Sequence, residues 1–145
     1  MNKTLLVLIL AVIVLTWNFV FTDKKVGLTD KARVLQGLSN AIAYKTAIAD
    51  YWAARHSLPD NKAWLNEKND IRVDLSQTIV KAIEVGIEGP GVISVHYVSR
   101  PGLESASGIE GKIIQLIPTI ENNTLVWTCK GTVAANLLPK NCSPL

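Results

Sequence analysis

An apolar run near the N-terminus, Thr4 to Phe21, constrains this chain more than any other feature. It has eighteen residues and no charged side chain. As an α-helix it would extend roughly 27 Å, close to the thickness of a bilayer's hydrocarbon core. A cleavable signal peptide would have a shorter run followed by small residues, whereas this one continues through Trp17-Asn18-Phe19. A buried core helix would usually keep a polar stripe. The run therefore favours an uncleaved membrane anchor over both alternatives.

The remainder of the chain has the composition of an ordinary small domain. We expect an anchor helix with its junction over residues 1–27 and one globular domain over residues 28–145. Charged residues make up 19% of the chain, below the usual quarter, as a strongly apolar segment would cause. The net charge of +3 is small, and the lysines and arginines are scattered along the chain. A nucleic-acid partner is therefore not expected.

Cys129 and Cys142 are the only two cysteines. A pair this close, in a chain with an export-type anchor, predicts a disulfide, which persists in oxidising compartments. Closing so short a loop would contribute about 3 kcal/mol in the loop-entropy account. Zinc binding is disfavoured because no His stands at zinc spacing. Lys3 on one side of the apolar run nearly balances Lys24 and Lys25 on the other, so the cysteines decide that the domain lies outside the cytoplasm.

A helical period follows the anchor, from Leu28 to His56. Pro59 is expected to end this helix because proline restricts its predecessor and lacks an amide donor. Lys45 interrupts the apolar face, and we interpret its stem as lying along that face with the ammonium in water. The polar stretch Asn61 to Asp74 predicts a surface loop with a short helical turn. The apolar face comprises Val34, Leu38, Ala41, Ile42, Ile48, Ala49 and Trp52.

Four short runs rich in Ile and Val predict strands. Turn residues separate them, including Gly89-Pro90-Gly91 and Glu121-Asn122-Asn123. Closely spaced strands with short turns favour an antiparallel meander. With the helix lying across one face, this gives an α+β domain built on a four-stranded antiparallel sheet. The expected strands are Ile79–Ile87, Gly91–Val98, Lys112–Ile120 and Thr124–Lys130.

Catalytic and metal-binding patterns find little support. No nucleophile-elbow, phosphate-loop or zinc-protease motif occurs. His56 is interpreted as a helix-end residue and His96 as a solvent-facing or hydrogen-bonded strand residue. We therefore predict no enzyme, no cofactor and no metal site. The aromatic side chains are expected to belong to the core rather than to a binding surface; they are Tyr51, Trp52, Trp64 and Trp127.

Several segments resemble type IV pilins in their order and spacing, over roughly residues 28 to 142. The helix contributes three of them, the sheet two and the C-terminal loop two. They are Ala32–Ser39, Ala43–Ala47, Asp50–Trp52, Gly91–Val95, Leu116–Pro118, Trp127–Gly131 and Leu138–Cys142.

This resemblance implies a long N-terminal helix packed on an antiparallel sheet and a C-terminal loop closed by Cys129–Cys142. It implies a bacterial inner-membrane protein with a periplasmic domain, which reaches the pilus or cell surface by assembling with other pilin subunits or the pilus machinery. Pilins are not enzymes; their fibres serve adhesion, twitching motility and DNA uptake. The expected function is a membrane-anchored subunit contributing to pilus structure, cell adhesion or motility.

Two departures from the pilin pattern favour an alternative. The start Met1–Leu6 lacks the Gly that ends a pilin leader, and the apolar run lacks the carboxylate found in the family. A non-polymerising accessory or regulatory protein of the pilus system, held in the membrane, would fit these departures. A further alternative is an adhesive or DNA-binding module in which Lys112, Lys130 and Lys140 supply a weak positive patch.

Overall fold

The computed structural model describes residues 30–67, 71–99 and 108–145. These ranges all fall within the predicted globular domain, residues 28–145. The predicted anchor, residues 4–21, and the junction up to residue 27 lie outside the described residues. Within the three described ranges, no helix combines the length and apolar character needed to cross a membrane.

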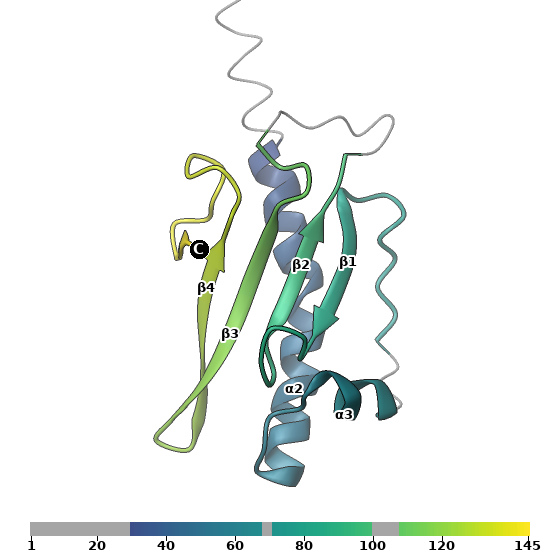
Figure 1. Cartoon of the computed structure of the whole chain (residues 1–145), viewed down its shortest axis with the longest axis vertical. Helices are drawn as coiled ribbons and strands as arrows, with labels where there is room; N and C mark the ends of the chain where they lie inside the picture. The colour runs from purple at the N-terminus through teal and green to yellow at the C-terminus, as the bar shows by residue number, and fades with distance from the viewer. Residues whose placement is uncertain (1–29, 68–70, 100–107) are drawn as a thin grey trace, which may run out of the picture.

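One long helix lies across one face of a five-stranded sheet, which confirms the predicted α+β class (Figure 1). Helical residues 30–40 lead into α2, and we call the two together the long helix. The strands follow one another across the sheet in sequence order. The elements are α2 (Ile42–Arg55), α3 (Asn61–Asn66), β1 (Val80–Val85), β2 (Ile93–Tyr97), β3 (Ile113–Glu121), β4 (Thr124–Gly131) and β5 (Cys142–Pro144).

The long helix buries a narrow stripe against the sheet. Val34, Ala41 and Ile48 are fully buried and stand seven residues apart, which is close to two helical turns. Ile42 was predicted to face the core, and this prediction is wrong because its side chain is 59% exposed. A residue that follows Ala41 is rotated by about 100° around the helix axis, so it points along the flank.

The long helix ends one residue before His56, the last residue of the predicted helical segment. Arg55 is its last residue, and His56 adopts a left-handed conformation with φ 53°. The His56 N–H donates to the Trp52 carbonyl oxygen at 2.8 Å, which pairs one of the carbonyls left open at a helix end. His56 therefore occupies the helix-end position that the sequence predicts.

Strands β1 to β4 form the predicted antiparallel meander. β3 and β4 join through Asn122 and Asn123, whose φ angles of 48° and 60° suit a two-residue turn matched to strand twist. The turn between β1 and β2 runs over residues 86–91 and begins at Gly86, with φ 78°. A Cβ at Gly86 would lie 2.4 Å from the Asn61 backbone nitrogen, so only glycine fits there.

The sheet has five strands rather than the four predicted. β5 pairs in parallel with β4, with Cys142 opposite Cys129. This strand is three residues long and contains Pro144, which is tolerated at a sheet edge because no further strand needs its donor. So short a segment has no alternation of apolar and polar residues, and for this reason the sequence pattern did not reveal it.

A buried tyrosine joins the sheet to the long helix. Tyr97 at the end of β2 is 2% exposed, and its hydroxyl donates to the Val34 carbonyl oxygen at 2.9 Å. Burial raises the pKa of the Tyr97 hydroxyl, so it stays a protonated donor. A Cβ at Gly37 would lie 2.6 Å from the Tyr97 hydroxyl oxygen. Glycine at position 37 thus creates the space that lets the ring pass under the helix.

The predicted surface loop after the long helix contains the expected helical turn, α3. Asp60 caps it, since its side chain accepts a 2.7 Å hydrogen bond from the Ala63 N–H. The Asn61 side-chain amide donates to the Val85 carbonyl oxygen at 3.0 Å. The first bond caps α3, and the second fixes α3 against the end of β1.

Candidate functional site

The C-terminal loop, residues 130–141, is closed by a disulfide between Cys129 in β4 and Cys142 in β5, with their Cα atoms 4.5 Å apart. Val133, Leu137 and Leu138 are buried and join the main core. The loop is therefore a packed part of the domain, and its sulfurs lie where the sequence predicts a disulfide.

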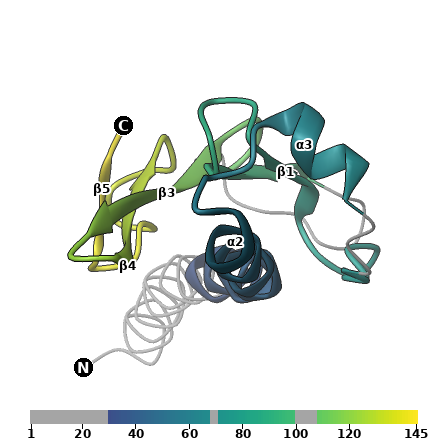
Figure 2. The ribbon, with the colours of Figure 1, turned by 90° about the horizontal axis from the view of Figure 1, so that it is seen from below.

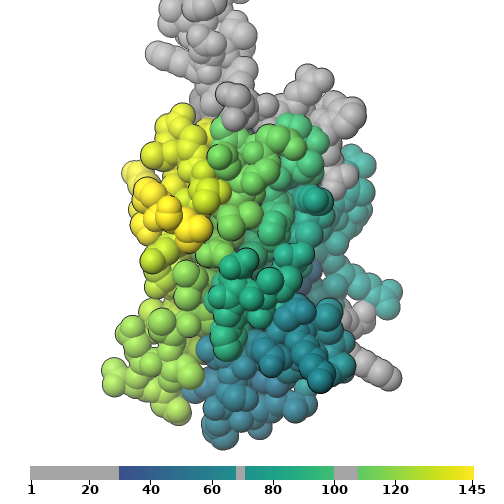
Figure 3. Space-filling model, in the orientation of Figure 1, coloured from purple at the N-terminus to yellow at the C-terminus, as the bar shows by residue number. Residues whose placement is uncertain are grey.

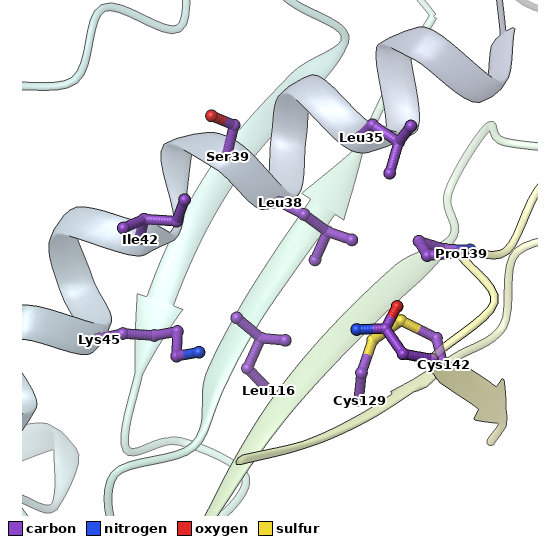
Figure 4. A pocket seen from close by; sticks show the side chains of 10 residues that line it. Leu35, Leu38, Ser39, Ile42, Lys45, Leu116, Cys129, Pro139 and Cys142 are labelled. Carbon is purple, nitrogen blue, oxygen red and sulfur yellow. A yellow bond between two sulfur atoms is a disulfide. The ribbon is translucent and has the colours of Figure 1, made fainter. Parts of the chain in front are cut away.

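A groove separates the C-terminal loop from the long helix, and we call it the helix–loop groove. It encloses about 340 Å³ and lies open at the surface. In Figure 4 the leucines of the helix and Leu116 of β3 face the disulfide across it. The side chains that line it are Leu35, Leu38, Ser39, Ile42, Lys45, Leu116, Cys129, Pro139, Asn141 and Cys142.

Lys45 supplies the positive charge in the helix–loop groove. Its Nζ lies 5.1 Å from the centre of the Trp127 ring, a cation–π distance. The stem crosses the apolar side of the helix and the ammonium reaches the groove, as Figure 4 shows. The sequence analysis interpreted the Lys45 stem as lying along the apolar face with its ammonium in water, and this position fits that interpretation. The contact with the Trp127 ring was not predicted.

A second, smaller hollow of about 280 Å³ lies beside the end of the long helix. Arg55 forms an ion pair with Glu67 and stands 4.9 Å from the Tyr51 ring centre. Because the Arg55 guanidinium already contacts the Glu67 carboxylate and the Tyr51 ring, it is not a free cation for binding a ligand in this hollow. Exposed ion pairs of this kind contribute on the order of 0–1 kcal/mol.

The aromatic side chains are packed against the core only in part. Trp64 of α3 stacks with Tyr44 at 6.2 Å between ring centres, and both pack against the core. Trp127 of β4 also packs against the core. Tyr51 and Trp52 are half-buried on α2. The predicted core role therefore describes Trp64 and Trp127 better than the two aromatics of α2.

The two histidines lie in different parts of the fold and contact different groups. His56 is the exposed helix-end residue described above. His96 of β2 places its Nε2 2.9 Å from a carboxylate oxygen of Glu84 on the neighbouring strand. Among the described residues, no three His, Cys, Asp or Glu side chains gather in a way that could hold a metal ion.

The lysines proposed for DNA binding lie in three separate segments of the chain. Lys112 is half-buried ahead of β3, Lys130 is exposed on β4, and Lys140 is exposed in the C-terminal loop. None of the three lines either hollow described above. They do not add a positive wall to the helix–loop groove.

Residues 31–143 match the protein-family model described as pilin, a bacterial filament protein. The chain belongs to the pilin family. The predicted resemblance is confirmed, and the match runs from the first turn of the long helix into β5. A search of curated proteins gives no match. Pilins form a structural, non-enzymatic family, and membership implies assembly with other pilin subunits into a filament, with a place on the pilus or cell surface.

Sequence reasoning missed two features of this pilin that position the site. The first is the contact of Gly37 with Tyr97, although glycine inside a helix is unfavourable by about 1 kcal/mol relative to alanine and therefore signals close packing. The second is the outward position of Leu35 and Ile42, which are 46% and 59% exposed at the groove. Their spacing of seven residues was the available signal, since it puts both on one side of the helix.

Proposed function

We propose that this pilin is a type IV subunit held in the bacterial inner membrane by residues 4–21, with its globular domain in the periplasm before assembly. In this proposal residues 1–27 are the anchor and junction, and residues 28–145 are the domain that becomes the pilus surface. The observation that carries the proposal is the family match over residues 31–143, on a helix-on-sheet fold with a disulfide-closed C-terminal loop.

The proposed role is structural, in pilus architecture and through it in adhesion or motility, with no catalytic function. The family match supports this assignment, because pilins form a structural, non-enzymatic family.

Shearing of pili from the native host tests the filament role. We expect the full chain in the sheared, sedimentable fibre fraction, and deletion of its gene should shorten or remove those fibres. Surface motility and attachment to a solid support, measured on the same strains, would assign the role to motility or adhesion. A chain found only in membranes, with fibres unchanged after deletion, would contradict the subunit role.

The anchor is tested by truncation. A chain whose residues 1–27 are replaced by a cleavable export signal peptide should be recovered in the soluble periplasmic fraction with its disulfide formed, whereas the full chain should require detergent. Matched replacement of Leu8 and Val12 by lysine in the full chain should also impair membrane retention, because charges are costly inside a bilayer. Persistent membrane binding of the truncated chain would refute the proposed anchor.

An accessory role is a second candidate, supported by the lack of any carboxylate in residues 4–21. In this version the protein remains in the membrane and acts on true pilins. Intact-mass measurement of the protein from host membranes separates the two roles. The mass of the full chain less two hydrogens favours the accessory, and a shortened chain with a methylated amino terminus favours the filament subunit.

A further inference from the structure

The face of the molecule opposite the helix–loop groove carries an exposed apolar side chain next to a carboxylate, which would complement the apolar walls and the lysine of the groove. This pair of side chains belongs to the β1–β2 turn, residues 86–91, in which Ile87 is 54% exposed and is followed by an exposed Glu88. Figure 2 shows the turn on one side of the sheet and the long helix on the other. In Figure 3 the residues near 90 stand on the surface facing the viewer.

The β1–β2 turn presents Ile87 from a fixed backbone. The Gly86 N–H donates to the Val92 carbonyl oxygen at 2.9 Å, and the Val92 N–H donates to the Gly89 carbonyl oxygen at 3.0 Å. The Gly91 N–H donates to the Pro59 carbonyl oxygen at 2.8 Å, which joins the turn to the segment ahead of α3. A side chain held in this way loses little conformational freedom when it enters a partner.

The helix–loop groove suits an apolar side chain with an adjacent carboxylate. Leu35, Leu38 and Ile42 give it apolar walls, and Lys45 places one cation at its end. Its volume of about 340 Å³ stands near the lower limit for small-molecule pockets. Its polar lining side chains are Ser39, Lys45 and Asn141, and of these only Lys45 carries a charge. The occupant that matches its size and charge is a side-chain pair such as Ile87 and Glu88.

We propose that the β1–β2 turn of one copy inserts Ile87 into the helix–loop groove of a second copy, with Glu88 beside Lys45. This contact rests on the proposed filament role and specifies the surfaces it would use. Because the turn and the groove are different surfaces on opposite faces, the contact is heterologous. Each copy keeps one free turn and one free groove, so repeating the contact gives an open array rather than a closed dimer.

Cysteine crosslinking of full-length chains in host membranes and pili tests the contact. Ile42→Cys and Ile87→Cys are placed in separate copies, produced together and oxidised. We expect a crosslinked dimer from the mixture and not from either variant alone. A chain carrying both changes should form a ladder of higher oligomers. Intact mass of uncrosslinked chains checks that Cys129–Cys142 has formed normally.

Ile120→Cys is the matched control because Ile120 is 50% exposed and also precedes a glutamate, Glu121. Crosslinking of Ile42→Cys with Ile120→Cys should be at background. An Ile42–Ile120 yield equal to that of Ile42–Ile87, strong self-crosslinking of Ile42→Cys, or no 42–87 product would each overturn the proposed contact.

Charge exchange gives a second readout. Lys45→Glu and Glu88→Lys should each reduce the 42–87 crosslink by roughly tenfold or more, since like charges then meet across the contact. Combining both changes in every copy should restore most of the yield. Failure of the combined variant to recover would overturn the pairing of Lys45 with Glu88.

The outcomes for this contact and for the proposed filament role are distinguishable. Fibres in the sheared fraction without a 42–87 crosslink would sustain the filament role and overturn the contact. A 42–87 crosslink confined to membranes, with no fibres, would support the contact and overturn the filament role.

Discussion

The helix–sheet core and the C-terminal loop of this pilin bury similar side chains but are held in place by different means. In the core, Val34 and Ile48 of the long helix and Ile93 of β2 are fully buried, and the helix and the strand are distant in sequence. In the loop, Val133 and Leu137 are also buried, but both come from one segment whose ends are joined by the disulfide. The core thus depends on many apolar contacts between distant segments, whereas the loop combines one covalent bond with the packing of its buried side chains against that core.

The largest expected loss comes from a change in the core. Ile48→Ala should lower the free energy of unfolding by about 2–5 kcal/mol, because it removes buried methyl groups and leaves a cavity between helix and sheet. Urea unfolding of the full chain in detergent, followed by near-UV circular dichroism, would measure this. Ile42→Ala is the control on the same helix and should change the free energy by less than about 0.5 kcal/mol, as an exposed position does. Equal losses would contradict the assignment of the two faces.

Removal of the disulfide should affect the loop before the core. Cys129→Ser with Cys142→Ser should lower the free energy of unfolding by about 3 kcal/mol in the loop-entropy account. Hydrogen exchange should show faster exchange in residues 130–141 while the amides of β1 to β3 keep most of their protection. If β2 lost protection as early as the loop, the proposed division between the two regions would be wrong.

The contact of Gly37 with Tyr97 tests how tightly the core is packed. Gly37→Ala should lower the free energy of unfolding by about 1–3 kcal/mol, because the added methyl meets the tyrosine hydroxyl and ring. Tyr97→Phe alone should cost about 1 kcal/mol through its lost hydrogen bond to Val34. The double variant should lose less unfolding free energy than the sum of the two single losses, since the tyrosine hydroxyl is the atom nearest to the new methyl. Strict additivity would show that the helix moves away instead.

Local sequence patterns were sufficient for most of this fold. The 3.6-residue period revealed the long helix, and runs of Ile and Val between turn residues revealed β1 to β4 within a few residues of their ends. These patterns work because each element buries one side against a continuous core. The same reasoning placed Ile42 wrongly, because an apolar face drawn from sequence is wider than the stripe that the sheet covers.

The candidate site was harder to predict because it depends on tertiary contacts. β5 is too short to carry a pattern and follows from the pairing of Cys142 with Cys129. The helix–loop groove exists only where the C-terminal loop returns to the helix. The spacing of Leu35 and Ile42 indicates one side of the helix, but no local signal shows that the C-terminal loop lies beside it. The cysteine pair was predictable because its chemistry requires the two residues to meet.

The smallest expected effect concerns α3, which contacts the core through the partly buried Trp64 and lies outside the disulfide-closed loop. Asp60→Ala should lower the free energy of unfolding by about 1 kcal/mol, because the Ala63 N–H loses its cap. Asp50→Ala, an exposed change within α2, is the matched control and should have little effect. Hydrogen exchange should be faster in residues 61–66 while the long helix is unaffected. Because Pro59 also accepts from Gly91, a loosened α3 would release the β1–β2 turn and reduce the 42–87 crosslink, whereas an unchanged crosslink would show that the turn holds its shape without α3.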